Sequence, residues 1–111
     1  MKHEMRLHPE PFNLIKKGTK TIEMRLYDEK RRQIKEGDLI TFTNRETDEK
    51  IDTEVLKLHI YPSFEELYKH FDKVSIGYNE DETPNPDDMD IYYPKDKQKK
   101  YGVVGIQIKR K

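Results

Sequence analysis

The stretch Gly18-Thr19-Lys20-Thr21-Ile22-Glu23-Met24-Arg25 decides how this chain is interpreted. Apolar residues at positions 22, 24 and 26 alternate with polar residues at positions 21, 23, 25 and 27, which is the period of two expected for a β-strand. A short helix over residues 12–17 can end at Gly18, because glycine readily adopts the left-handed conformation common at helix C-termini. If the apolar set faces the core, Glu23 and Arg25 lie together on the opposite face of the strand.

Lys20 has the parity of Ile22, so in an uninterrupted strand its side chain would point away from Glu23 and Arg25. The three charged side chains converge only if the chain bends around Lys20–Thr21. Together they would suit a nucleotide: arginine grips a phosphate or base edge, glutamate accepts from an exocyclic amine, and lysine beside a cation can act as a base. The competing interpretation is a solvated Glu23–Arg25 pair worth less than about 1 kcal/mol.

The composition bounds the kind of protein. The chain has 111 residues, of which 40% are charged and 32% hydrophobic, so we expect one domain over residues 1–111 with a small core. It contains no cysteine, which excludes disulfides and thiolate chemistry. No apolar run approaches the roughly 20 residues of a membrane span, and no secretory signal opens the chain. These features favour a cytoplasmic protein, and a monomer.

Nothing in the sequence indicates a metal or a cofactor. The four histidines have no metal-ligand spacing, and no glycine-rich phosphate loop or nucleophile-elbow serine is present. The acidic stretch over residues 78–90 lacks the glycine-centred spacing of a calcium loop. We therefore expect no metal and no cofactor. The four histidines are His3, His8, His59 and His70.

Charge is uneven along the chain although the net charge is zero. Residues 1–35 carry ten Lys or Arg against five Asp or Glu, and residues 95–111 carry seven against one. The middle, residues 36–94, carries five against sixteen. If the first and last strands adjoin in space, one basic face results. A solvated surface of mixed charge is the alternative for residues 95–100.

The remaining elements follow from local patterns. Ser63-Phe64-Glu65-Glu66 is a capping box that starts a helix running to about residue 72. The change of apolar parity near Val55-Leu56 predicts a bulge in the strand over residues 51–60. Residues 78–90 are expected to form an acidic loop with a helical turn from about Asp87. Further strands are expected over residues 3–7, 20–27, 39–44 and 101–109, and a further helix over 94–100.

Gly18–Arg25 resembles the G-x-K-x-x-E-x-R signature of the ASCH domain, a branch of the PUA-like superfamily. Glu10-Pro11-Phe12, residues 34–42 and the closing Tyr101–Ile106 are also similar to the family's flanks. The element pattern alone allows either a barrel or an open α+β sandwich. The resemblance implies an α+β fold: a PUA-like small β-barrel of five to six mostly antiparallel strands, with short helices inserted between strands.

The resemblance also implies RNA or a nucleotide-like small molecule as the partner. Tyrosines beside cations suit base stacking, although Tyr93 and Tyr101 could equally be core residues. Our leading hypothesis is an RNA- or nucleotide-binding domain with a charged ligand cleft. Its expected ligand-binding residues are Lys20, Glu23, Arg25, Tyr27 and Tyr101.

Two further functions stay open. Some small relatives are amidohydrolases that deacetylate N4-acetylcytidine, with a motif similar to Gly-x-Lys-Thr-x-Thr-x-Arg, and others have been proposed to be ribonucleases. In a hydrolase Lys20 would be the catalytic base, but Glu23 stands where the amidohydrolases have threonine, which argues against that activity. A later glutamate of those enzymes could correspond to Glu65, Glu66 or a carboxylate of residues 80–90. The third hypothesis is a protein-interaction module that uses the acidic loop.

Overall fold

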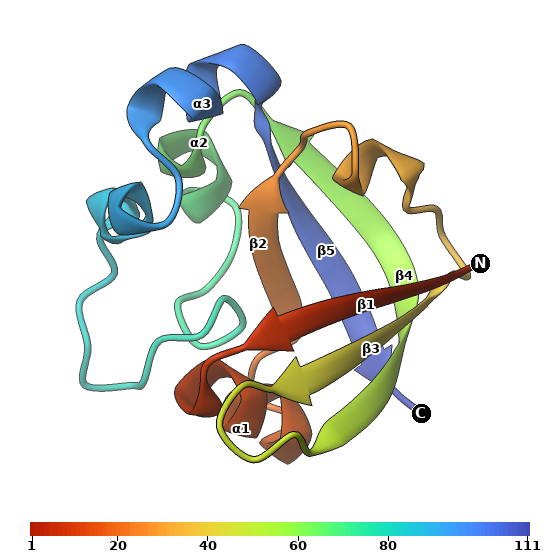
Figure 1. Cartoon of the computed structure of the whole chain (residues 1–111). Coiled ribbons are helices and arrows are strands. Elements are labelled where there is room, and N and C mark those ends of the chain that lie inside the picture. Colours follow the sequence, from red (N-terminus) through yellow and green to blue (C-terminus); the bar gives the residue numbers. More distant parts are fainter.

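The chain forms a five-stranded sheet that curls into a half-barrel, as seen in a computed structural model of all 111 residues (Figure 1). The strand order is β1-β3-β4-β5-β2, so β1 and β2 are the two edges. The expected α+β PUA-like barrel is confirmed. The strands are β1 (Lys2–Leu7), β2 (Ile22–Leu26), β3 (Leu39–Asn44), β4 (Lys50–Tyr61) and β5 (Val103–Arg110). The helices are α1 (Pro9–Lys17), η1 (Arg31–Gln33), α2 (Phe64–Tyr68), η2 (Pro86–Ile91) and α3 (Lys95–Tyr101).

Most strand pairs are antiparallel, as expected, but β1 pairs with β3 in parallel. The first strand, β1, has only β3 as a neighbour, whereas the last strand, β5, lies between β4 and β2. The first and last strands are not neighbours. The single basic face expected from adjoining terminal strands does not form in that way. None of the helices is both long and apolar enough to cross a membrane.

A cluster of apolar side chains fills the inner face of the curled sheet. Val104, Ile106 and Ile108 of β5 belong to it, as their alternation indicates, and α1 contributes Phe12 and Ile15. The register of β4 against β5 shifts between Val55 and Lys57, which confirms the predicted bulge. The bulge lets Val55 stay fully buried while Leu56 is exposed.

A second apolar cluster covers the other face of β2 and β5. Ile22, Met24 and Leu26 pack there against Phe64, Leu67 and Ile76. Gly105 allows this close approach, since a Cβ at its position would lie 3.1 Å from Ile22. The apolar set of β2 thus faces a core, as expected, but the opposite face is covered too. Strand β2 is buried on both sides, and Glu23 lies on the barrel side.

The segment between β4 and β5 is built from short helices. Ser63 caps α2, accepting from the Glu66 N–H at 3.2 Å, and the helix ends at Tyr68 instead of the expected residue 72. Asn85 caps η2 in the same way by accepting from the Asp87 N–H at 3.0 Å, which confirms a helical turn near Asp87. The Lys73 ammonium donates to the Glu80 and Glu82 carbonyls, so a cation from outside the acidic loop orders it.

Candidate functional site

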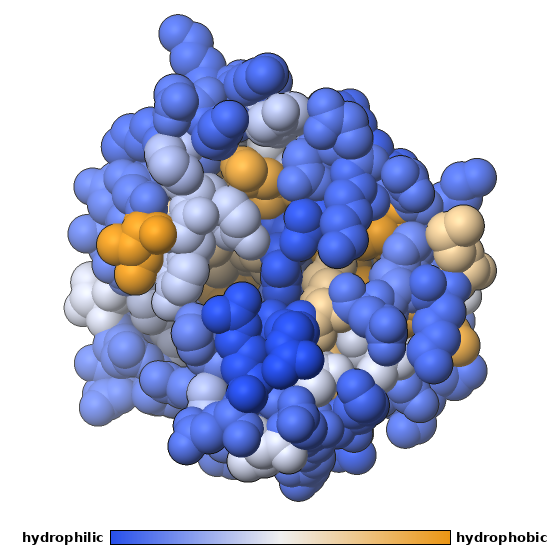
Figure 2. All heavy atoms as spheres, viewed as in Figure 1, coloured by the Kyte–Doolittle hydropathy of each residue, from blue (hydrophilic) through white to orange (hydrophobic).

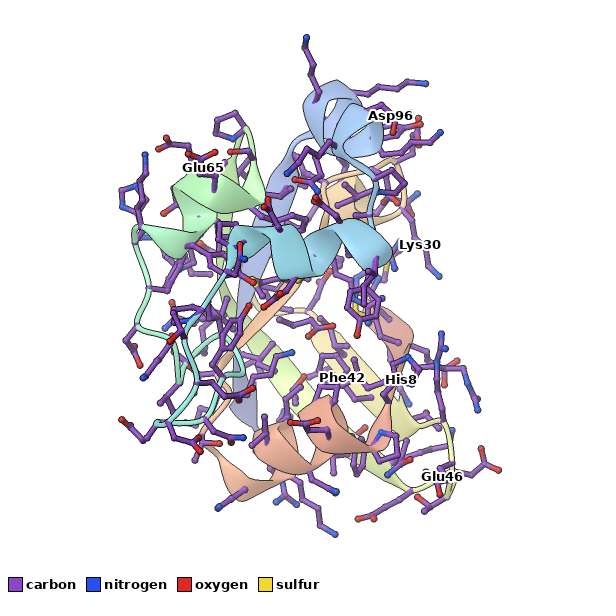
Figure 3. The ribbon with its side chains drawn as sticks, turned by 90° about the vertical axis from the view of Figure 1, so that its left-hand side faces the viewer. His8, Lys30, Phe42, Glu46, Glu65 and Asp96 are labelled. Atoms are coloured by element: carbon purple, nitrogen blue, oxygen red, sulfur yellow. The ribbon has the colours of Figure 1, made fainter.

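A pocket of about 890 Å³ lies along the free edge of β2, where the half-barrel is open. Its walls come from α1, from the end of β1, from residues 76–78 and from η2 with the residues after it. Figure 3 shows α1 and η2 on the same side of the sheet, toward opposite ends. Figure 2 shows a hollow on this face, with hydrophilic side chains around much of it and apolar side chains beside it. Because β2 is an edge strand, Glu23 and Met24 both line the pocket, although they belong to opposite faces.

The chain bends before β2, and this bend brings Lys20 to the same side as Glu23. The N–H groups of Thr21 and Ile22 both donate to the Ser75 carbonyl at 3.0 Å, which breaks the strand pattern at this point. The strand begins only at Ile22. The bend that the three side chains need in order to converge is therefore present, and the Lys20 ammonium lies 2.8 Å from Glu23 Oε1.

Gly77 makes room for the Lys20 side chain. Its φ of +111° is in the region that favours glycine. A Cβ at this position would lie 3.3 Å from Cδ and 3.7 Å from Nζ of Lys20. Lys20 is only 8% exposed as a result. Nothing near Lys20 in the sequence indicates this contact, because residue 77 lies far along the chain.

Glu23 is the centre of the charged group. It is 3% exposed, and its two oxygens accept from different cations: Oε1 from Lys20 and Oε2 from Arg25 Nε, each at 2.8 Å. Burial alone would raise the pKa of the Glu23 carboxyl, but the charges and hydrogen bonds of Lys20 and Arg25 outweigh it, and the net pKa lies below its usual value. The floor of the pocket is thus a buried carboxylate between two cations.

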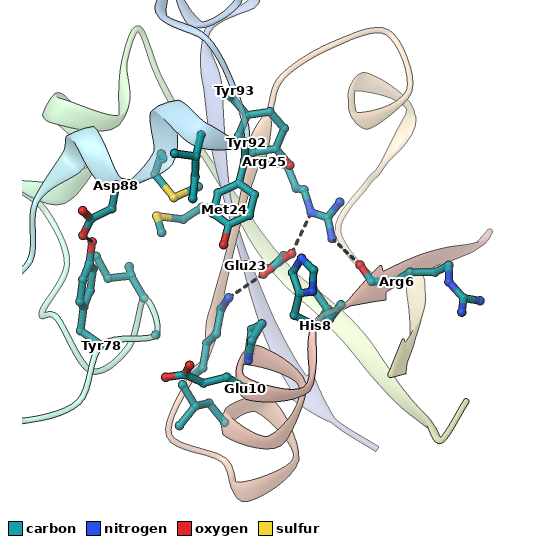
Figure 4. A pocket seen from close by; sticks show the side chains of 18 of the residues that line it. Arg6, His8, Glu10, Glu23, Met24, Arg25, Tyr78, Asp88, Tyr92 and Tyr93 are labelled. Atoms are coloured by element: carbon teal, nitrogen blue, oxygen red, sulfur yellow. Dashed lines mark hydrogen bonds and ion pairs between the residues drawn. The ribbon is translucent and has the colours of Figure 1, made fainter. Parts of the chain in front are cut away.

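Arg25 extends this group across the opening of the barrel. Its Nη2 lies 3.4 Å from the Arg6 carbonyl at the end of β1, so the side chain joins the two edge strands (Figure 4). Burial opposes the charged guanidinium, but Glu23 favours it more strongly, and the pKa of Arg25 is raised. Burial likewise raises the pKa of the neighbouring Tyr93 hydroxyl, although Arg25 and Arg31 act against that shift. The charges of both arginines thus act on this hydroxyl, and all three residues line the pocket.

The other end of the pocket is aromatic and less charged. The Tyr68 and Tyr78 hydroxyls lie 2.9 Å apart, and the Tyr78 hydroxyl donates to Asp88 Oδ2 at 2.7 Å. Burial raises the pKa values of both tyrosines, so their hydroxyls stay protonated and act as donors. Figure 4 places Tyr78 and Asp88 on one side of Met24 and Arg25 on the other. The pocket is polarised: the Tyr68–Tyr78 pair lies at one end, and the arginines, with Tyr93 beside them, lie at the other.

Two exposed rings face each other at the rim. The centroids of His8, which precedes α1, and Tyr92, which follows η2, are 6.5 Å apart at an interplanar angle of 45°. Tyr92 is 56% exposed, although an aromatic side chain of that size is normally buried. Its ring is available to a flat ligand that enters the pocket.

The structure brings together three of the five residues expected to bind ligand. Lys20, Glu23 and Arg25 line the pocket, whereas Tyr27 and Tyr101 do not. Tyr27 follows the last residue of β2, and its ring lies under the Arg32 guanidinium. Tyr101 ends α3 and packs against the second apolar cluster. Tyr27 does pack on the barrel side of the sheet, as the alternation predicts, but it lies beyond the pocket.

Several lining residues carry no signal in the sequence. They come from five separate segments and meet only in the folded chain. Of the carboxylates considered for a hydrolase, the pocket contains Asp87 and Asp88 but neither Glu65 nor Glu66. No three His, Asp or Glu side chains gather where they could hold a metal ion. The lining residues that sequence reasoning missed include Arg6, His8, Glu10, Arg31, Arg45, Tyr68 and Tyr78.

Comparisons with known proteins agree with the fold. The family model of the ASCH domain matches residues 5–111. The chain is similar to the hypothetical protein PH0355, known from a crystal structure, with 37% sequence identity, a TM-score of 0.84 and 100% of both chains covered. It is also similar to the solution NMR structure of protein PF0455 from Pyrococcus furiosus, with 37% identity, a TM-score of 0.71 and 99% of this chain and 97% of that chain covered. No protein of curated function matches the chain.

Proposed function

Because the chain belongs to the ASCH domain family, we propose that its pocket binds RNA or a nucleotide-like ligand through Lys20, Glu23 and Arg25. ASCH and PUA-like domains are generally associated with RNA binding. The observation that carries the proposal is the buried Lys20–Glu23–Arg25 group at the floor of an open pocket of about 890 Å³. That volume falls within the range of small-ligand sites.

The polarised pocket fits the two chemical ends of a nucleotide. Arg25 and Arg31 approach Tyr93 at one end and favour phosphate oxygens. Tyr78 and Met24 at the other end, with the exposed Tyr92 at the rim, offer surfaces against which a base can stack. The ligand would therefore lie with its base toward the tyrosines and its phosphate toward the arginines.

Glu23 fixes the donors in this proposal. Each of its oxygens already accepts from one cation, so it holds the ammonium of Lys20 and the guanidinium of Arg25 in place. Lys20 keeps further N–H donors that no other protein group accepts. Donors held in place lose little conformational freedom when a ligand binds. Lys20 and Arg25 contact the ligand, and Glu23 positions them.

Binding is favoured over hydrolysis by the state of Lys20. An ammonium paired with Glu23 at 2.8 Å has no lone pair with which to accept a proton from water. The hydrolases that the family includes use a threonine at the place of Glu23. We therefore propose a binding site and treat catalysis as an outcome of the test.

The experiment is a titration with a panel of nucleosides (N4-acetylcytidine among them), nucleotides and short RNAs, followed by calorimetry for binding and by mass spectrometry for products. Wild-type protein is expected to bind a nucleotide without turnover. Tyr92→Ala is expected to weaken binding about tenfold, because stacking on one aromatic ring contributes about 1–3 kcal/mol. Tyr92 is exposed, so the variant will fold.

Ile91→Ala is the matched control, because Ile91 is also exposed and also lines the rim but has no ring to stack. It is expected to bind nearly as well as wild type. A protein that binds no member of the panel would contradict the proposal. Release of acetate or of a shortened RNA, lost in Lys20→Ala, would assign a hydrolase instead.

A further inference from the structure

We propose that Arg32 and Lys100, each held over a tyrosine ring, bind the backbone phosphates of a single-stranded nucleic acid whose nucleotide occupies the pocket. The inference rests on the proposed function and extends it from a pocket to a strand path. We call this region the cation–tyrosine surface; it consists of Tyr27, Arg32, Lys97, Lys100 and Tyr101. None of these five residues lines the pocket.

Arg32 is fixed in place yet exposed. Its guanidinium carbon lies 4.3 Å from the centroid of the Tyr27 ring, and its Nη2 donates to the Tyr101 carbonyl at 3.2 Å. Its side chain has no ion pair and makes no other hydrogen bond, so further N–H donors are available to a ligand. A guanidinium restrained by a ring and a carbonyl loses little freedom when it grips a phosphate.

Lys100 is arranged similarly on α3. Its ammonium lies 5.1 Å from the centroid of the Tyr101 ring, and it has no carboxylate partner. Lys97 is one helical turn away, exposed and also without an ion pair, so it shares the same face of the helix. Lys95 differs, because it pairs with Asp87 and Asp90. Two free cations of α3, Lys97 and Lys100, therefore lie near Tyr101, whereas Lys99, also unpaired, lies on the side of Lys95.

The backbone joins the two halves of the surface. The Tyr27 N–H donates to the Gly102 carbonyl at 3.0 Å, next to Tyr101. Two basic segments that are distant in the sequence, one after β2 and one in α3, thus form one charged region. Residues 27–33 and 96–101 together carry six Lys or Arg and three Asp or Glu. One of those carboxylates, Asp28, is already paired with Arg31 at 3.1 Å.

The surface is continuous with the pocket through η1. Successive side chains of a 3₁₀-helix project about 120° apart. Arg31 accordingly lines the pocket, whereas the next residue, Arg32, lies over Tyr27. Arg31 Nε is the one buried side-chain N or O atom in the protein without a hydrogen-bond partner. A phosphate at this junction cannot reach that buried Nε, but it can meet the exposed part of the Arg31 side chain, which is 17% exposed.

The test uses the double variant Arg32→Gln/Lys100→Gln with a labelled single strand of about ten nucleotides, a length that covers one small binding domain. Affinity, followed by fluorescence anisotropy, is expected to fall about tenfold. The log–log dependence on salt is expected to flatten by about 1.4, since each lost contact with a single strand accounts for about 0.7. Affinity for a mononucleotide, which reaches only the pocket, is expected to stay unchanged.

The control is Lys17→Gln/Lys111→Gln, which removes two exposed positive charges that belong to neither site. If Arg32→Gln/Lys100→Gln binds the oligonucleotide as tightly as this control does, the inference is wrong. The pocket proposal would still stand in that case, provided that Tyr92→Ala weakens mononucleotide binding. Equal binding of an acidic peptide of matched charge would also overturn it. If the strand binds but Tyr92→Ala has no effect on it, the link between surface and pocket is wrong, whereas the pocket proposal is decided by mononucleotide binding.

Discussion

Two buried carboxylates, Glu23 and Asp38, have similar exposure but different surroundings. Glu23 is 3% exposed and Asp38 8%. Asp38 Oδ2 lies 2.8 Å from His3 Nε2 and accepts from the Lys35 N–H at 3.0 Å, and Asp38 Oδ1 accepts from the terminal ammonium at 3.2 Å. These partners belong to the backbone or to the start of β1, and none lines the pocket. Asp38 fastens the first strand beside β3.

Glu23 is bound instead by two long side chains that both line the open pocket, and Lys20 keeps donors that no protein group accepts. The comparison teaches that burial of a charge is not by itself the mark of a site. What distinguishes Glu23 is where the donors on its partners point. We therefore expect changes at Glu23 to affect both stability and ligand binding, and changes at Asp38 to affect stability alone.

Glu23→Ala is expected to have the largest effect, a loss of about 3–5 kcal/mol in the free energy of unfolding. The reason is that it leaves Lys20 and Arg25 buried without a counter-charge. Urea denaturation followed by circular dichroism measures it. The matched control is Lys20→Met/Glu23→Leu/Arg25→Met, which removes all three charges and should recover most of the stability while abolishing nucleotide binding. A loss below about 1 kcal/mol in Glu23→Ala would mean that the group is solvated.

Asp38→Ala is expected to cost less, about 1–3 kcal/mol, because its hydrogen bonds are lost but the terminal ammonium it leaves behind can be hydrated. Nucleotide affinity should equal that of wild type, as measured by calorimetry under conditions where both proteins are folded. If Asp38→Ala loses as much nucleotide affinity as Tyr92→Ala does, Asp38 affects ligand binding as well as stability, and the distinction from Glu23 is wrong.

Two glycines offer a finer form of the same comparison. Gly77→Ala and Gly37→Ala both place a Cβ where φ is positive, +111° and +88°, so each should lose about 1–2 kcal/mol of stability. Only at Gly77 does the new Cβ meet a side chain, 3.3 Å from Lys20 Cδ; at Gly37 nothing lies within 4 Å. Nucleotide affinity should therefore fall several-fold in Gly77→Ala and stay unchanged in Gly37→Ala. Equal affinities would show that the position of Lys20 is unimportant.

The pH dependence of stability gives the smallest effect. The hydrogen bond with His3 is the main cause that lowers the pKa of Asp38 from 3.8 to about 2, with help from the Lys35 N–H and the terminal ammonium. A carboxyl with a lowered pKa stabilises the fold above its unfolded-state value and loses that contribution as it is protonated. Wild type should thus lose more stability than Asp38→Ala between about pH 4 and pH 2. The pKa of Glu23 is also lowered, so the free energy of unfolding of Asp38→Ala should still fall somewhat as the pH falls.

The control for that measurement is Asp81→Ala, an exposed carboxylate of the acidic loop without a hydrogen-bond partner. Its acid unfolding curve should superimpose on that of wild type. If the acid unfolding curve of Asp38→Ala also superimposes on that of wild type, His3 and the N-terminus do not lower the pKa of Asp38 as we expect.

Local patterns in the sequence predicted the parts of the fold that depend on neighbouring residues. The parity change at Val55-Leu56 predicted the bulge, Ser63 the start of α2, and Gly18 the end of α1 with φ of +94°. The length of α2 was overestimated, because the apolar spacing continues to Phe71 after the helix has ended at Tyr68. Periodicity reports which side chains are buried, and a turn can bury them as well as a helix.

The site could be predicted only where it is local. Glu23 and Arg25 follow from alternation, and the need for a bend at Lys20 follows from its parity. The cause of the bend does not, because Ser75 and Gly77 act through contacts across more than fifty residues of chain. The parallel pairing of β1 with β3, which leaves the barrel open beside β2, is likewise a long-range choice. The pocket exists because of that opening, so no single motif contains it.

The most direct test of the account is a nucleotide titration followed by ¹⁵N NMR of the side-chain signals of Arg25 Nε and Lys20 Nζ. We expect both signals to shift in proportion to bound ligand while the ring signals of His3, beside Asp38, stay where they are. Saturable binding that leaves the Arg25 and Lys20 signals unmoved would contradict it.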